Sequence, residues 1–309
     1  MTPAPTTHTR SIATTQTYPV RVVSVAAIGF SLVSAALFGA LSVTLGLAMR
    51  RTRDADAGAQ ATVLVALLVC GLTALATRSW RGEIWPFLLA GLVAPGGSQL
   101  LYVHAVREAG AARTSVVVGA APLVSVTIAV AVLREPVRPG LVVGAVLIVA
   151  GGLALAGERD RPQRFRAAGL LLAFASASLF ATRDNLVRWL AESSQTPPQL
   201  AAAATLVSGS AFIALYVLLR TGCNFPRRVL AAFRPFALSG ALWGLSYAAL
   251  FEAFYRGRVT VVSPLVATEA LFGVLIATFV LGRSELIGRQ VVVGALLVVA
   301  GGVLIGAFR

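Results

Sequence analysis

Hydrophobic positions in this chain gather into ten apolar runs that are separated by short polar joints. A helix needs roughly 20 apolar residues to cross about 30 Å of hydrocarbon, and each run is close to that length or longer. The runs are residues 22–49, 59–77, 84–106, 111–133, 137–157, 167–190, 198–219, 234–256, 259–281 and 288–308. The pattern predicts an all-α integral membrane protein with ten transmembrane helices.

The polar segments outside these runs carry little apolar surface. Residues 1–21, rich in Thr, Ser and Pro, are predicted to be a disordered tail. The Arg-rich segment at 158–166 is predicted to be a linker, because it is too short to fold alone. The run at 22–49 is about twice as long as the apolar region of a signal peptide, so we interpret it as an uncleaved first span.

An internal repeat organises the ten runs. The segment VGAVLIVAGG at 143–152 returns as VGALLVVAGG at 293–302, displaced by 150 residues. It divides the membrane portion into halves at 22–157 and 167–308, each with five runs. Because five is odd, the second half must enter the membrane from the opposite side. The sequence therefore predicts inverted-topology repeats, an arrangement that secondary transporters use to bind substrate near the midplane.

Composition supports the membrane class. Hydrophobic residues make up 57% of the 309 residues and charged residues 12%, whereas soluble domains have about 45–50% and about 25%. These values exclude a soluble cytosolic enzyme. All 26 basic residues are arginine, and the net charge is +14. The arginines cluster in the joints, so membrane lipids explain them better than nucleic acid, which is not expected as a partner.

Motifs in the two halves point to one family. Each half has a proline-containing fourth span, an exit from that span with Leu and Glu, and a Gly-Gly pair in its fifth span. The residues are Pro122, Leu133, Glu135, Gly151 and Gly152 in the first half, and Pro264, Leu281, Glu285, Gly301 and Gly302 in the second, where Glu285 comes two residues late. The second half also has Thr268 and Glu269 inside the span and Gly282 after Leu281. The pattern resembles the EamA-type branch of the drug/metabolite transporter superfamily. The resemblance implies ten-span exporters or exchangers of small metabolites, with a central cavity lined by spans 1, 3, 4, 6, 8 and 9.

Ionisable residues inside the spans are few. A charge at the centre of a span costs about 2.5–3.5 kcal/mol on insertion scales, so each needs a partner or a water-filled cavity. The candidates are Arg183, Asp184, Glu252 and Glu269, with Arg183 the one arginine well inside a span. The functional hypothesis is that Glu269 or Glu252 binds a proton or a cationic group, while Arg183 meets an anionic group such as a carboxylate.

A structural interpretation of the same residues stays open at this level. Arg183 would pair with Asp184 or Glu252, because all three are expected at similar depths and an ion-paired cluster facing the cavity is one possible arrangement. Glu269 would then accept hydrogen bonds from neighbouring backbone groups.

Aromatic and amide side chains form a second group of candidates. Trp243 and Tyr247 recur at helical spacing in the eighth run, and Gln99 and Tyr102 lie in the third. A cavity for apolar or aromatic metabolites combines such walls with a few polar groups. The alternative is that these aromatic residues face lipid or pack between helices, with Tyr102 in an interfacial belt. Gly96 and Gly97, beside Pro95, predict a hinge or a broken helix in the same run.

Several chemistries lack the residues that they need. The chain has no lysine and therefore no phosphate-binding loop for ATP hydrolysis. Cys70, Cys223 and His104 do not have the spacing of a metal site, so neither a metal nor a cofactor is expected. Small-residue pairs such as Gly140 with Gly144 suit close helix packing within a monomer or in a homodimer.

The predicted function is that of a multi-pass protein of the plasma or inner membrane that exports or exchanges a small organic metabolite or drug. One rival is a membrane-embedded lipid-modifying enzyme, which needs an acid/base or metal cluster at the interface that the sequence does not offer; we therefore predict that the protein is not an enzyme. Another rival is a non-transporting assembly protein, which predicts no central polar cavity. Orientation stays open, because loop arginines favour both termini outside and the resemblance favours both inside.

Overall fold

The computed structural model describes residues 24–78, 81–131, 139–156, 165–281 and 287–308, and this part of the chain is helical with short turns and no strand. The all-α prediction is therefore confirmed for the described residues. The predicted tail at 1–21, most of the predicted linker and the exit residues Leu133, Glu135, Gly282 and Glu285 lie outside them.

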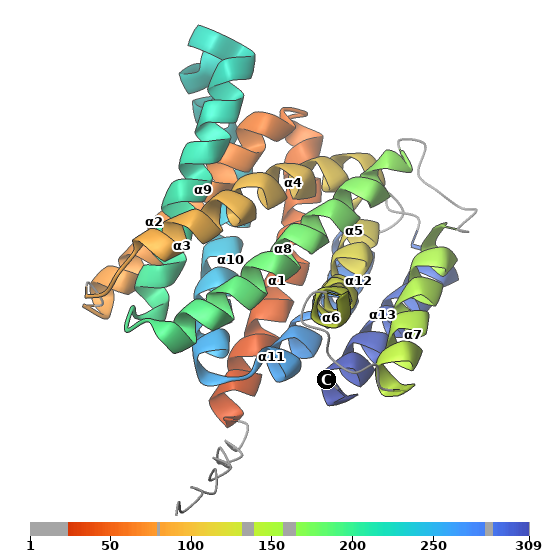
Figure 1. Ribbon diagram of the computed structural model, residues 1–309. Coiled ribbons are helices and arrows are strands. Elements are labelled where there is room, and N and C mark those ends of the chain that lie inside the picture. The colour runs from red at the N-terminus through yellow and green to blue at the C-terminus, as the bar shows by residue number, and fades with distance from the viewer. Residues whose placement is uncertain (1–23, 79–80, 132–138, 157–164, 282–286, 309) are drawn as a thin grey trace, which may run out of the picture.

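The helices follow the ten apolar runs in order (Figure 1). The first half contains α1 (Val25–Arg51), α2 (Ala55–Ala76), α3 (Trp85–Gly91), the π-helical turn η1 (Leu92–Gly97), α4 (Ser98–Ala109), α5 (Ala111–Val118), α6 (Ala121–Ala131) and α7 (Pro139–Ala156). The second half contains α8 (Ala168–Ser193), α9 (Pro198–Thr221), the 3₁₀ turn η2 (Gly222–Asn224), α10 (Phe225–Arg256), α11 (Val259–Val266), α12 (Glu269–Val280) and α13 (Arg289–Phe308).

Helix length and hydropathy establish a multi-pass membrane protein. Seven helical segments of the described chain are long and apolar enough to cross a membrane. One of these, Pro198–Arg256, contains 59 residues in α9, η2 and α10, far more than one crossing needs. Two further apolar helical segments, Ala111–Ser125 and Pro139–Leu155, are shorter than the usual span. Seven segments by this criterion do not establish ten crossings.

Three of the apolar runs are interrupted; in the fourth run, α5 ends at Val118 and α6 begins at Ala121. In the third run, Ala94 leaves the helical region at φ −145° and ψ 121° within η1, next to Pro95, which lacks an amide donor. The predicted break beside Gly96 and Gly97 is therefore present. In the ninth run, α11 ends at Val266 and α12 begins at Glu269. The break places Glu269 in the first turn of a helix that starts inside the span.

The repeated glycine motif packs against its own copy. Helices α7 and α13 lie side by side (Figure 1). A Cβ atom added to Gly144 would lie 2.7 Å from the carbonyl oxygen of Gly301, and one added to Gly301 would lie 2.5 Å from that of Gly144. Only glycine permits this approach of the two backbones. The small-residue stripe predicted for packing or dimerisation thus packs within one chain.

The bundle has two opposite faces formed by helix ends, and each is named here after a residue that lies at it. The Asp54 face holds the end of α1 and the starts of α2, α8 and α10, and it lies uppermost in Figure 1. The Glu252 face holds the opposite ends, where α8 and α10 finish and α9 and α11 begin. Both halves of the chain contribute helices to each face.

Candidate functional site

A cavity lies between helices of both halves, and water-sized molecules can occupy about 30 Å³ of it. Its lining residues are Phe38, Val118, Ala121, Pro122, Ser125, Phe180, Ala181, Arg183, Asp184, Leu250, Ser263, Val266, Ala267 and Glu269. Phe38 and Phe180 lie at the middle of α1 and α8, and Asp184 and Ser263 lie nearer the Glu252 face. The cavity therefore occupies the middle of the bundle and its Glu252 half.

Arg183 is the best-anchored polar group of the cavity. Arg183 is 1% exposed. Its Nε and Nη2 atoms donate to Asp184 Oδ1 over 2.8 and 2.6 Å. The guanidinium carbon lies 4.9 Å from the centre of the Tyr247 ring and 5.4 Å from that of Phe180, within the range of cation–π attraction. Nη1 has no hydrogen-bond partner. The cation is thus held by one carboxylate and two rings, with one donor group unused.

Glu269 faces the same cavity without a donor. The residue is 7% exposed, and in the described part of the chain its carboxylate makes no hydrogen bond or ion pair. The backbone hydrogen bonds of the structural interpretation are therefore not found among the described residues. Its place in the first turn of α12 favours negative charge, but an ionised carboxylate without a partner is costly at this depth. The group suits a proton or a cationic group of a substrate.

Glu252 does not join Arg183 and Asp184. Arg256 donates from Nε to Glu252 Oε2 over 2.7 Å, and the Gln199 amide donates to Oε1. The Arg256 guanidinium lies 5.3 Å from the centre of the Phe30 ring. Of the two pairings left open for Arg183, the structure shows the one with Asp184, while Glu252 is bound by a cation that its own helix supplies one turn later.

The aromatic candidates are buried and lie beside the cavity. Trp243 and Tyr247 are fully buried and stack edge to face at 5.8 Å. The Tyr247 hydroxyl accepts from Thr205 Oγ1 at 3.3 Å. The Tyr247 ring does not line the cavity but contacts the guanidinium of Arg183, which does. Tyr102 is buried with its ring 6.1 Å from that of Phe180. The lipid-facing and interfacial alternatives are therefore wrong for these three residues.

The family follows from a comparison with known proteins. The sequence profile of the EamA-like transporter family matches residues 25–156 and, a second time, residues 167–307. The chain belongs to the EamA-like transporter family. This membership makes it a membrane transporter of the drug/metabolite transporter type and is consistent with a protein that is not an enzyme.

A comparison with solved structures supports the fold alone. A solved structure titled "Crystal structure of protein" is 20% identical to this EamA-like chain, with a TM-score of 0.54. The match covers 88% of this chain and 96% of that chain. No curated protein matches.

Sequence reasoning missed several residues of this EamA-like site. Phe180 lies three and four positions before Arg183 and Asp184, so helical spacing alone places it on their face of α8. Ser125 and Ser263 come from other helices, and no sequence signal brings them to α8. Arg113 in α5 is fully buried, with its guanidinium 5.9 Å from the centre of the Phe165 ring. Arg113 is the third residue of α5 and so lies near the end of its run, and its burial does not contradict the prediction that Arg183 is the one arginine well inside a span.

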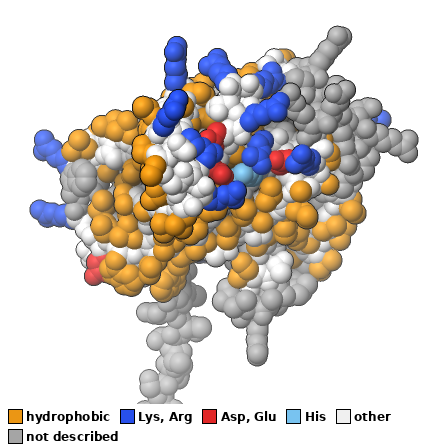
Figure 2. Space-filling view, turned by 90° about the horizontal axis from the view of Figure 1, so that it is seen from above, with side chains coloured by type: hydrophobic (Ala, Val, Ile, Leu, Met, Phe, Trp, Pro, Cys, Tyr) orange, Lys and Arg blue, Asp and Glu red, His pale blue; other side chains and the backbone are white. Residues whose placement is uncertain are grey.

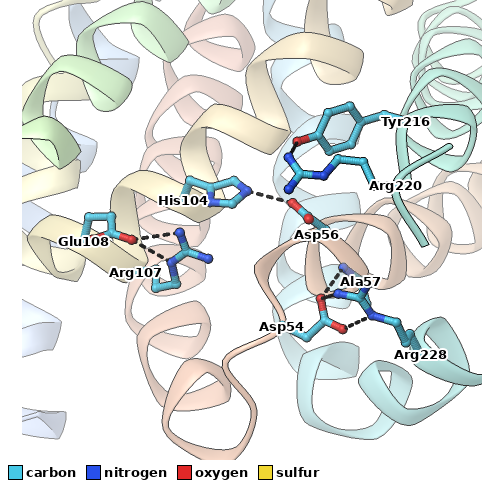
Figure 3. Close-up of polar contacts among 9 residues, drawn as sticks. All are labelled: Asp54, Asp56, Ala57, His104, Arg107, Glu108, Tyr216, Arg220 and Arg228. Atoms are coloured by element: carbon cyan, nitrogen blue, oxygen red, sulfur yellow. Dashed lines mark hydrogen bonds and ion pairs between the residues drawn. The ribbon is translucent and has the colours of Figure 1, made fainter. Parts of the chain in front are cut away.

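At the Asp54 face, charged side chains contact one another and hold helix ends together. Figure 2 shows arginine side chains gathered on this face around acidic side chains and a histidine. Arg228 donates to both carboxylate oxygens of Asp54 over 2.6 and 2.7 Å, and Asp54 also caps α2 by accepting from the Ala57 amide (Figure 3). His104 Nε2 lies 2.8 Å from Asp56 Oδ1. The Arg228–Asp54 pair joins the two halves of the transporter at this face, whereas the His104–Asp56 contact lies within the first half.

Metal chemistry finds no support among the described residues. They contain no group of three or more His, Cys, Asp or Glu side chains placed to hold a metal ion. Cys70 is buried and Cys223 exposed, and neither forms a disulfide.

Proposed function

We propose that this EamA-like protein is a secondary transporter that exports or exchanges a small organic molecule with an anionic group, such as a carboxylate, across the plasma or inner membrane. Arg183 binds the anionic group, and Glu269 binds a proton or a cationic group of the same substrate. A zwitterionic substrate satisfies both residues at once.

The observation that carries this proposal is the unused Nη1 donor of Arg183. A purely structural arginine in a membrane is expected to pair all its donor groups, because no bulk water replaces a missing acceptor. Here Asp184 and two rings hold the guanidinium of this cavity-lining residue, yet its buried Nη1 group has no acceptor. Charge-assisted hydrogen bonds to such a fixed cation give both orientation and affinity.

The cavity also separates this function from its rivals. A non-transporting assembly protein predicts no central polar cavity, whereas Arg183, Asp184 and Glu269 share one. A lipid-modifying enzyme needs a cluster of reacting groups at the membrane surface. On the Asp54 face, the carboxylates of Asp54 and Asp56 are instead bound by Arg228 and His104.

We further propose ten crossings in two inverted repeats. Interrupted crossings would comprise α3 with α4, α5 with α6, and α11 with α12, while α9 and α10 would be separate crossings. The self-packing of the glycine motif in α7 and α13 supports a two-fold relation between the halves. Alternating access then arises when one part of this bundle rocks about the cavity.

Transport in proteoliposomes tests the proposal. Uptake of carboxylates, zwitterionic amino acids and amines would be measured with and without a pH gradient, for the wild type and for Arg183→Gln. A charge-assisted hydrogen bond contributes about 1.5–3 kcal/mol, so we expect Arg183→Gln to lower uptake of carboxylates about 10- to 100-fold. Arg227→Gln, at an exposed arginine, is the matched control. Wild-type uptake by Arg183→Gln contradicts the proposed role of Arg183.

A further inference from the structure

Unpartnered polar groups gather where the third run is broken. Ser98 Oγ and both amide atoms of Gln99 have no hydrogen-bond partner, and both residues are fully buried. They are the first two residues of α4, directly after η1. Buried polar groups are nearly always paired with protein, ordered water or a ligand. Three unpaired atoms on consecutive residues therefore need an explanation.

Contacts with α8 place these groups relative to the cavity. Ser176 Oγ donates to the Ser98 carbonyl oxygen over 2.9 Å, so the start of α4 lies beside Ser176. Ser176 precedes Arg183 by seven residues, about 10 Å along the helix at 1.5 Å per residue. Because α8 starts at the Asp54 face, Ser98 and Gln99 lie on the Asp54 side of the cavity.

An aromatic ring separates the two places. Phe180 lines the cavity, and it lies on α8 between Ser176 and Arg183. Its ring contacts Tyr102 at 6.1 Å and Phe38 at 6.2 Å, both edge to face. A molecule that leaves the cavity toward the Asp54 face meets Phe180 first, and then the start of α4.

We infer that Ser98 and Gln99 form a second, occluded binding station, which pairs with an uncharged hydrogen-bonding group of the substrate, such as a hydroxyl or an amide. This inference rests on the proposed function. A glutamine side chain offers two donors and one carbonyl acceptor, and a serine hydroxyl offers both roles. Neither residue carries a charge, so an ionic group at the station would lack a counter-ion and would be costly. Phe180 is the barrier between the two stations.

The competing explanation of the unpaired atoms is a packing defect. The Gln99→Leu variant distinguishes a packing defect from a binding station. Leucine removes the unpaired amide, so both explanations expect a higher melting temperature in detergent. They differ in transport, which is measured for matched pairs of substrates that differ by one hydroxyl, such as serine against alanine and lactate against propionate. The station predicts that the wild type prefers the hydroxylated member about tenfold, the value of one hydrogen bond with a neutral partner, and that Gln99→Leu brings the ratio close to one. An unchanged ratio in Gln99→Leu overturns the station.

Gln60→Leu is the matched control. Gln60 is buried like Gln99, and its carbonyl oxygen is also unpaired, but its amide nitrogen donates to Ser210 Oγ over 3.0 Å. Leucine at this position removes a made hydrogen bond, so we expect a lower melting temperature and an unchanged substrate ratio. If Gln99→Leu does not fold, Ser98→Ala is used to measure the same ratio.

Ligand-induced thermal shifts distinguish failure of the station from failure of the transporter proposal. If the wild type transports none of the substrates, the shift caused by each pair is measured on the solubilised protein. A larger shift with the hydroxylated member, lost in Gln99→Leu, supports the station although transport is refuted. Equal shifts, or none with either member, overturn the station.

Discussion

Glu269 and Glu252 are two buried carboxylates of the second half with opposite surroundings. Each residue is 7% exposed, and each lies in a largely apolar run of the sequence. Glu252 is bound by Arg256 and Gln199, whereas Glu269 lines the cavity and, among the described residues, has no donor. Burial in a span therefore does not by itself identify a functional charge. The partners of the charge do.

The local sequence explains half of this difference. Arg256 follows Glu252 by four residues, one helical turn, which is the spacing at which opposite charges meet. The residues four before and four after Glu269 are Leu265 and Gly273, neither of which can pair with a carboxylate. Any partner of Glu269 must therefore come from another helix or from a ligand.

The contacts of Glu252 also have a counterpart in the first half. Gln199, the second residue of α9, bonds to Glu252 near the end of α10. Asp56, the second residue of α2, contacts His104 near the end of α4 (Figure 3). Both contacts tie a helix start to the end of the next long segment, on opposite faces. This correspondence favours a structural role for Glu252.

Replacement of Glu269 by Gln is expected to have the largest effect on transport. The substitution keeps the shape and removes the charge, and a hydrogen bond to a charged group contributes about 1.5–3 kcal/mol, which corresponds to about 10- to 100-fold in an affinity. Uptake in proteoliposomes should fall by about that factor, with the melting temperature unchanged or higher. Wild-type transport by this variant would show that Glu269 binds neither a proton nor a substrate cation.

Asp184→Asn is expected to act mainly on stability. It removes the carboxylate that anchors the buried Arg183, and breaking a buried pair at one partner typically costs about 3–5 kcal/mol. The free energy of unfolding, measured by denaturant titration in detergent, should fall by about 3 kcal/mol. Arg228→Gln, which breaks the more exposed pair with Asp54, should cost less than 1 kcal/mol. Equal losses would mean that Arg183 does not depend on Asp184.

Glu252→Gln should have the smallest effect and is the matched control for Glu269. The side chain of its partner Arg256 is 48% exposed, and such partly solvated pairs contribute about 0.5 kcal/mol. We expect transport within twofold of the wild type and a slightly lower melting temperature. Loss of transport equal to that of Glu269→Gln would remove the distinction between the two carboxylates.

The sequence by itself determined the parts of this protein that depend on neighbouring residues. Apolar length predicted helical spans, the copied glycine motif predicted two halves, and Pro95 predicted the break in the third run, which η1 contains. The pairing of Arg183 with Asp184 was also foreseeable, since the two are adjacent. Each of these features depends on residues that are close together in the chain, or on one segment of the sequence being a near copy of another.

Tertiary structure alone decided which distant residues meet. The family resemblance implies that the spans of Arg183 and Glu269 line one cavity, but nothing in the sequence puts Phe180 between that cavity and the start of α4. These placements depend on how closely glycine-bearing surfaces pack, as α1 does on α12 where a Cβ atom at Gly39 would lie 2.6 Å from the Gly273 nitrogen. The physical reason is that hydrophobicity is non-directional: it drives a helix into the bundle, and the shapes of the contacting surfaces then choose its neighbours.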